Sequence, residues 1–174
     1  MFSKAFNRSC AEKKSRVSRE EPVNIIGVIS DTHGLLRPEA LAALEGSDHI
    51  IHAGDVCDPA ILDRLREIAP VTAVRGNVDH GMYAENLPET ELVEIEGVTI
   101  YVLHILEKLD LNPEAAGIQA VIYGHSHVPR QETRNGVLYF NPGSAGPRRF
   151  NLPITVGKLM VNGDEIRGEI IDLC

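Results

Sequence analysis

The sequence is short of cysteine and has no long apolar run. Its three cysteines, Cys10, Cys57 and Cys174, lie far apart and form no CxxC motif. A disulfide framework is therefore not expected. The protein is instead expected in the cytoplasm, which is a reducing compartment. No apolar run approaches the roughly 20 residues that a membrane-spanning helix requires, so the sequence predicts no contact with a membrane.

Positive charge is also scarce, because 17 Lys and Arg residues stand against 25 Asp and Glu residues, for a formal net charge of -8. Phosphate backbones attract basic surfaces, so this balance argues against a general nucleic-acid binder. The acidity has two interpretations: it keeps the protein soluble, or part of it consists of carboxylates held for cations. Composition alone does not separate the two.

Residues 1–22 differ in character from the rest of the chain. They are rich in Lys and Arg but lack the apolar stretch of about 7–15 residues that a secretory signal contains. Three interpretations stay open: a disordered tail, a misassigned start codon and an organellar transit peptide. Pro22 marks the domain edge, and we expect one domain over residues 23–174, long enough to bury a full core.

The first half of this domain alternates short apolar runs with helical patterns. An alternation of strand, helix and strand indicates parallel strands that are joined by right-handed crossovers. The predicted elements are strands over 23–30, 48–54 and 70–76 and helices over 37–46 and 58–69.

The second half changes to hairpin patterns, with Asn135-Gly136 as a strong turn signal. We expect an α/β fold in which two mixed sheets pack face to face with helices outside, a four-layer αββα sandwich. The first sheet should be largely parallel at its start and the second antiparallel. The expected hairpins lie over 90–104, 131–141 and 154–173, with a further strand over 119–124.

Polar side chains follow nearly every expected strand. In open α/β sheets, ligands bind beyond the carboxyl ends of the strands, so these side chains should meet at one rim. Residues i and i+2 of an extended chain point to the same side, so a pair such as His125 and His127 could grip one cation. Each signal alone is weak, because Gly-Asp and Gly-Asn are usually turns. The full set is hard to assign to chance: Asp31, His33, Asp55, Asn77, Asp79, His104, His125, His127 and Asn141.

In order along the chain, the blocks "DTHG", "GDV", "GNVD", "LH", "GHSH" and "NPGS" resemble those of the calcineurin-like metallophosphoesterases, and of their small bacterial and archaeal phosphodiesterase branch in particular. The likeness covers about residues 23 to 172. It implies a two-sheet sandwich flanked by helices and a two-metal centre on the rim.

The resemblance also implies a role for each polar residue. The first metal would be bound by Asp31, His33 and His127, the second by Asn77, His104 and His125, with Asp55 bridging them. Asp55, Asn77 and His104 would be the catalytic residues among these ligands. Asn141 would line the site. Apart from the resemblance, we expect Asp79 to accept hydrogen bonds behind the ligands, and Arg148 and Arg149 either to lie in a solvated loop or to meet a substrate phosphate.

Two positions depart from the wider family. Val78 stands where many members carry a histidine that acts as an acid, and His80 is a weak substitute for it. The fourth block reads His104-Ile105 instead of His-Gly, which could reshape substrate access without removing the ligand. His49 and His52 are expected to be structural or surface residues.

Carboxylate, amide and imidazole ligands without thiolate suit borderline metals, so two divalent ions are expected, with manganese first and nickel, cobalt, iron or zinc as alternatives. Calcium prefers oxygen ligands only. The expected reaction is in-line attack on a small or nucleotide-like phosphodiester by a hydroxide that bridges the metals.

The alternative function is that of a scaffold, because a retromer subunit resembles this fold but has degraded metal positions. All seven inferred ligand positions here hold ligating side chains, which favours the enzyme. Antiparallel edge strands could pair copies of the chain into a homodimer or a higher homo-oligomer.

Overall fold

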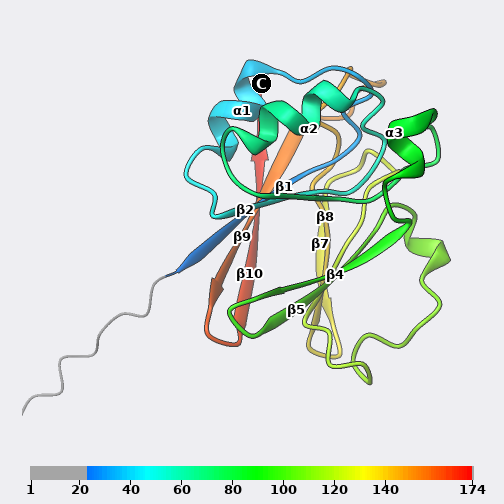
Figure 1. The fold of residues 1–174 in the computed structure, drawn as a ribbon. Helices are drawn as coiled ribbons and strands as arrows, with labels where there is room; N and C mark the ends of the chain where they lie inside the picture. The colour runs from blue at the N-terminus through cyan, green and yellow to red at the C-terminus, as the bar shows by residue number, and fades with distance from the viewer. Residues whose placement is uncertain (1–22, 174) are drawn as a thin grey trace, which may run out of the picture.

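The computed structural model describes residues 23–173 and contains two five-stranded sheets (Figure 1). The expected tail over 1–22 lies outside the described residues. The strand order of the first sheet is β10-β9-β1-β2-β3. In it β1, β2 and β3 are parallel to one another, whereas β9 is antiparallel to both of its neighbours, β1 and β10. Its strands are β1 (Asn24–Ile29), β2 (His49–His52), β3 (Val71–Ala73), β9 (Thr155–Asn162) and β10 (Glu165–Asp172).

The second sheet, ordered β4-β5-β6-β8-β7, was expected to be antiparallel, but its centre is parallel. β6 pairs in parallel with both β5 and β8. A crossover connection joins β5 to β6. After β6 the chain forms the edge strand β7, and β8 then lies between β7 and β6. Only the edge pairs are antiparallel. The strands are β4 (Thr90–Ile95), β5 (Val98–Leu103), β6 (Ala120–Ile122), β7 (Arg130–Arg134) and β8 (Val137–Asn141).

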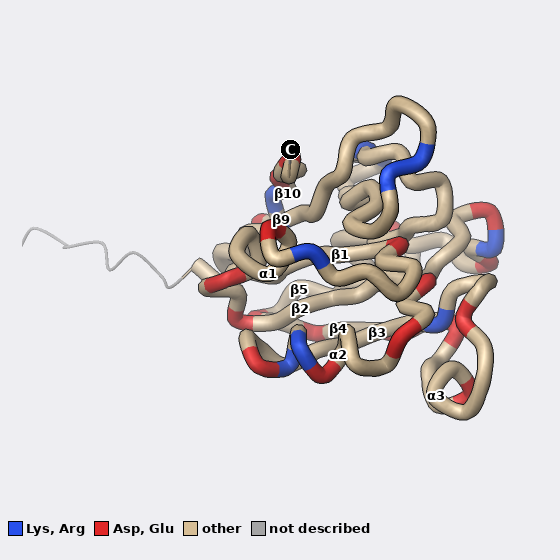
Figure 2. The backbone as a smooth tube through the Cα atoms, turned by 90° about the horizontal axis from the view of Figure 1, so that it is seen from above, with Lys and Arg blue, Asp and Glu red and all other residues tan. Residues whose placement is uncertain are grey.

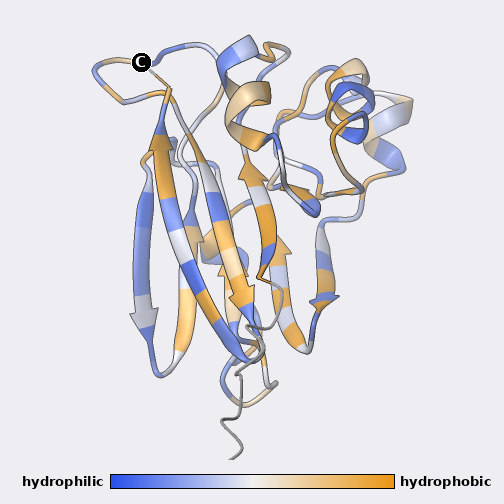
Figure 3. Cartoon of the chain, turned by 90° about the vertical axis from the view of Figure 1, so that its left-hand side faces the viewer, coloured by the Kyte–Doolittle hydropathy of each residue, from blue (hydrophilic) through white to orange (hydrophobic). Residues whose placement is uncertain are grey.

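The sandwich itself is confirmed, with the main core between the two sheets. Ile26, Ile100 and Phe140 are fully buried there, and Figure 3 shows hydrophobic colour concentrated on the central strands. The helices α1 (Pro38–Leu44) and α2 (Pro59–Arg66) cover the outer face of the first sheet. Each begins at a proline, and Asp58 accepts a hydrogen bond from the Ala60 amide to cap α2.

The fourth layer is thinner than expected. The outer face of the second sheet is covered by the 3₁₀ helix η1 (Leu106–Lys108) and by Leu109 and Leu111 in the loop after it. The short helix α3 (Met82–Glu85) follows β3 and was not predicted. Figure 2 shows Lys and Arg residues interspersed among Asp and Glu residues over the described chain.

The parallel strands of both sheets end at the same rim of the sandwich. Contacts between side chains that follow β1, β2, β5 and β6 establish this, since they join the two sheets across their carboxyl ends. The expected Asn135-Gly136 turn is present, with φ values of 49° and 81° that suit a two-residue hairpin loop. None of the helices in the described part of the chain is long and apolar enough to cross a membrane.

Candidate metal centre

One cluster at the rim joins the loops that follow β1 and β6. Asp31, His33 and His127 aim their ligating atoms at a common point. The two Nε2 atoms of His33 and His127 lie 3.1 Å apart, and Asp31 Oδ1 lies 3.2 Å from His127 Nε2 and 3.8 Å from His33 Nε2. Three ligand atoms this close together can hold a single cation.

A second cluster joins the loops that follow β2, β3 and β5. His104 Nε2 lies 3.3 Å from Asp55 Oδ2 and 3.1 Å from Asn77 Oδ1. The exposed ring of His125 stands edge-on to His104, with the ring centroids 5.3 Å apart. Carboxylate, amide and imidazole groups thus meet at this side of the rim as well.

Asp55 lies between the two clusters. Its Oδ2 atom is 3.9 Å from His33 Nε2 on one side and 3.3 Å from His104 Nε2 on the other. Its Oδ1 atom accepts a hydrogen bond of 3.0 Å from the Val78 amide. Burial raises the pKa of this carboxyl, but the hydrogen bonds from His104 and Val78 outweigh burial and hold the pKa below its ordinary value. A carboxylate is therefore available to both sides at neutral pH.

The residues present fit divalent cations, because their chemistry is unsatisfied without one. Asp31 Oδ1 is buried and accepts no hydrogen bond, whereas Oδ2 accepts them from Ser30 Oγ and the His125 amide. A buried carboxylate oxygen without a partner is costly. Burial lowers the pKa of His33 despite the carboxylates of Asp31 and Asp55, so its imidazole is neutral, as ligation requires.

The tautomer of His104 also suits ligation. Its Nδ1 atom lies 2.7 Å from the carbonyl oxygen of Ala53, which can only accept a hydrogen bond, so Nδ1 keeps a proton and Nε2 is the atom that a cation can bind. Burial lowers the pKa of His104, but the hydrogen bond to Asp55 and the nearby carboxylates outweigh it and raise the pKa overall. A bound cation would compete for Nε2 with the proton that this atom donates to Asp55.

The backbone at the rim is left-handed, not extended, which corrects the interpretation of the His-x-His pair. His125 and His127 have φ values of 67° and 58°, and they diverge: His127 joins Asp31 and His33, while His125 lies beside His104. Two aspartates and His33 share this conformation, with φ values between 46° and 57°. Such residues cost on the order of 1 kcal/mol each, so the rim stores strain in order to aim these side chains.

Glycines that precede the candidate ligands are needed for close approach. A Cβ atom on Gly76 would lie 2.0 Å from Asp55 Oδ1, and one on Gly54 would lie 2.7 Å from His104 Nδ1. One on Gly124 would lie 2.0 Å from Ser30 Oγ. The Gly-Asp, Gly-Asn and Gly-His pairs are therefore a packing requirement of the two clusters.

Asp79 holds the loops that follow β2 and β3. Its buried carboxylate accepts hydrogen bonds from three backbone amides, those of Asp55 at 3.0 Å, Gly76 at 2.7 Å and Cys57 at 2.8 Å. A fourth comes from the Tyr83 hydroxyl at 2.7 Å. Within residues 23–173 Asp79 bonds to none of the candidate ligand side chains, so it positions Asp55 through its own amide and Asn77 through the amide of the preceding Gly76.

The other expected residues of the site fall into two groups. Asn141 is buried and turned away from the ligand atoms: it donates to the Gly124 carbonyl oxygen at 2.9 Å and to Ser126 Oγ, and so braces the loop of the two histidines. Arg148 is exposed in the loop after β8. Its neighbour Arg149 reaches the rim, with a guanidinium nitrogen 3.5 Å from His33 Nε2.

His52 lies fully buried beneath the rim and links two of its loops. The Gly54 amide donates to Nδ1 at 3.2 Å, so Nε2 carries the proton and donates to Thr32 Oγ1 at 3.0 Å. Burial lowers the pKa of His52 to about 4. The imidazole is neutral in the folded protein and would be charged in the unfolded chain below its ordinary pKa.

This burial predicts a specific loss of stability in acid. The folded pKa lies below the unfolded one, so the unfolded chain binds the extra proton and stability falls as the pH drops from about 6.5 towards 4. The shift corresponds to about 3 kcal/mol. Urea unfolding of metal-free protein at pH 7 and pH 4 should show wild type losing about 3 kcal/mol more than His52→Asn. Equal losses in the two proteins would contradict this role.

The comparisons with known proteins agree with this geometry. The model of the calcineurin-like phosphoesterase superfamily domain matches residues 25–164. The chain is 37% identical over 162 residues to a probable metallophosphoesterase of Methanocaldococcus jannaschii, covering 86% of this chain and 81% of that one. It is 30% identical over 155 residues to the phosphodiesterase YfcE of Escherichia coli, covering 75% and 84%.

Solved structures show the same fold. Vacuolar protein sorting 29 from Cryptosporidium parvum superposes with a TM-score of 0.76 at 20% identity, covering 87% of this chain and 92% of that one. An archaeal phosphodiesterase superposes with a TM-score of 0.70 at 25% identity, covering 84% and 99%. The expected class, a metal-dependent hydrolase of phosphoric esters, is confirmed, and the chain belongs to the calcineurin-like phosphoesterase superfamily.

Proposed function

We propose that this protein is a phosphodiesterase that binds two divalent ions, one in each cluster. The first ion would be held by Asp31, His33 and His127 and the second by Asn77, His104 and His125, with Asp55 shared. The observation that carries the proposal is the position of Asp55 Oδ2, which faces histidine nitrogens on both sides. A carboxylate placed in this way is suited to joining two cations.

Two bound divalent ions would supply Lewis acidity that activates water and offsets the charge of the phosphate. The protein's own residues align this centre: Asp79 and Asn141 fix the loops, and Val78 fixes one oxygen of Asp55. Val78 offers no proton to a leaving group. Diesters with good leaving groups should therefore be cleaved best, because they depend least on an acid.

The proposal is tested by stripping the protein of metal and measuring hydrolysis of bis(p-nitrophenyl) phosphate after adding Mn, Ni, Co, Zn, Mg or Ca in turn. We expect a transition metal to restore activity in wild type and in His49→Ala, but not in His125→Ala. His49 is a matched control, because it lies at the start of β2 and bonds to Thr72. Folded protein that binds metal but turns over no diester would favour the scaffold function instead.

Arg149 is proposed to meet a non-bridging oxygen of the phosphate, since its guanidinium lies beside His33 at the mouth of the first cluster. Arg149→Ala is expected to raise KM for a diester about tenfold, the factor that one charge-assisted hydrogen bond contributes. Arg148→Ala removes the same charge from the same loop and serves as the control. Equal effects of the two variants in steady-state kinetics would show that only the loop's overall charge matters.

Four finer expectations belong to this proposal: the metal, the substrate, the compartment and the oligomeric state. Manganese is the favoured metal, because the mixed oxygen and nitrogen ligands suit borderline ions. The substrate is a small or nucleotide-like diester, and the protein acts in the cytoplasm. Edge strands such as β7 and β10 could pair two copies into a homodimer or larger assembly, which light scattering would detect.

A further inference from the structure

A cavity of about 660 Å³ opens beside the second cluster. It lies between β5, the start of β4, the loop after β3 and the segment around η1. Asn77 and His104 belong both to the cluster and to the cavity wall, so a group bonded to a phosphate at the centre can extend directly into it. The volume is that of a site for a small organic group.

The charges on the cavity wall nearly balance, with two cations against three carboxylates. Arg75 is paired with Glu89 at 2.6 Å, and the carboxylate oxygens of Asp79 are occupied by the amides and hydroxyl described above. Within residues 23–173, Lys108 and Asp110 form no ion pair with each other or with another residue. One free cation and one free anion favour neither a highly charged ligand nor an apolar one.

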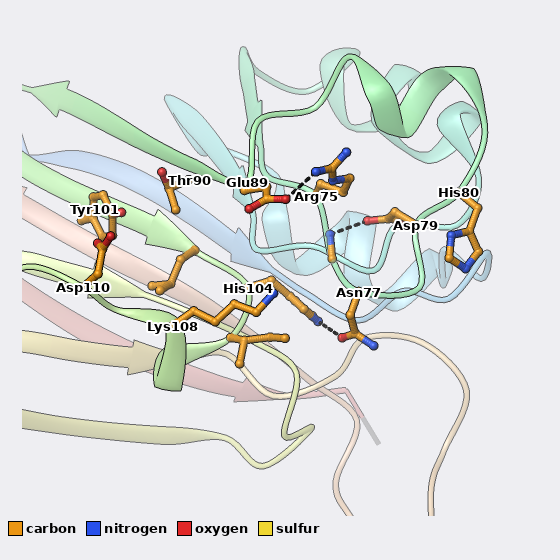
Figure 4. A pocket seen from close by; sticks show the side chains of 13 residues that line it. Arg75, Asn77, Asp79, His80, Glu89, Thr90, Tyr101, His104, Lys108 and Asp110 are labelled. Atoms are coloured by element: carbon orange, nitrogen blue, oxygen red, sulfur yellow. Dashed lines mark hydrogen bonds and ion pairs between the residues drawn. The ribbon is translucent and has the colours of Figure 1, made fainter.

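These two groups lie at different depths of the cavity. Figure 4 shows Lys108 extending towards His104, whereas Asp110 lies with Tyr101 at the end away from Asn77. The Thr90 side chain lies near that end too. Hydrogen-bonding groups are thus concentrated where the far part of an ester group would lie, and the cation is nearer the phosphate.

We propose that this cavity is the subsite for one ester group of the substrate and that it selects a neutral, hydroxyl-rich group such as a polyol or a sugar. Asp110 accepts hydrogen bonds from its hydroxyls, which a carboxylate does well. Lys108 attracts the phosphate itself, so it serves any diester. The inference rests on the proposed function and names the chemical class of its substrate.

The test compares two symmetrical diesters, bis(2,3-dihydroxypropyl) phosphate and dipropyl phosphate, as competitive inhibitors of bis(p-nitrophenyl) phosphate hydrolysis. They differ only in their hydroxyls, and their symmetry makes it irrelevant which ester group leaves. We expect the hydroxylated diester to bind about tenfold more tightly to wild type, and Asp110→Asn to reduce this ratio to about two. Asp164→Asn, an exposed change in the β9–β10 turn, should keep the ratio. Lys108→Ala should weaken both diesters by the same factor.

A ratio near one in wild type would overturn the proposal, as would a ratio that Asp110→Asn leaves unchanged. Neither result would contradict the proposed phosphodiesterase function, because that function is tested separately by hydrolysis of bis(p-nitrophenyl) phosphate. Loss of reporter hydrolysis with every metal would instead remove the proposed function and this subsite together.

Discussion

Asp55→Asn is expected to lower kcat for a phosphodiester by about a thousandfold, or about 4 kcal/mol in the activation barrier. Asparagine keeps the shape of the side chain and can still accept the hydrogen bond from Val78. It loses the negative charge that Asp55 presents to His33 and His104. The shared contact of the two proposed metal sites is therefore removed while the fold is kept.

Thermal unfolding separates this effect from misfolding. Saturating metal should raise the melting temperature of wild type, since a ligand that binds only the folded state stabilises it. The increase should be much smaller for Asp55→Asn, and the melting temperature of the metal-free variant should stay close to that of wild type. Asp164→Asn should behave like wild type in both assays. A variant with near-normal kcat would show that Asp55 is not shared between two cations.

Asp79→Asn is expected to be nearly as harmful, although Asp79 touches no ligand atom. Its amide nitrogen would face one of the backbone amides of Asp55, Gly76 or Cys57, which need an acceptor. A buried amide without an acceptor costs about 1–3 kcal/mol. The displaced loop should lower metal affinity or kcat about 10–100-fold, as outer contacts of metal sites do.

Three measurements check this expectation: urea unfolding of the metal-free protein, metal titration and steady-state kinetics. Tyr83→Phe removes one of the four hydrogen bonds and leaves the three amide donors satisfied, so its effect should be the smaller one in every assay. The positioning role of Asp79 would be contradicted if Asp79→Asn lowered stability but left metal affinity and kcat unchanged.

The sequence predicted most strands because their apolar runs are short and end at glycine, proline or an Asn-Gly turn. It did not predict the parallel centre of the second sheet, since hydrophobic periodicity reports which face is buried but not which strand is the neighbour. α3 and η1 were missed because a helix of three or four residues is too short to show a helical period.

The position of the site was predictable and parts of its geometry were not. Ligating residue types after six strands indicate one rim, because parallel strands end together. The split between His125 and His127 depends on left-handed backbone at both residues, which the residue types do not encode. Arg148 and Arg149 are likewise equivalent in sequence, and only the path of the loop brings Arg149 to His33.

The most direct test of the proposed two-metal centre is a crystal structure of manganese-soaked protein, with the ions located by anomalous scattering. We expect two peaks, one on each side of Asp55. One peak should contact Asp31, His33 and His127, and the other should contact Asn77, His104 and His125. A single peak at saturating manganese, or a second ion away from Asp55, would contradict this expectation.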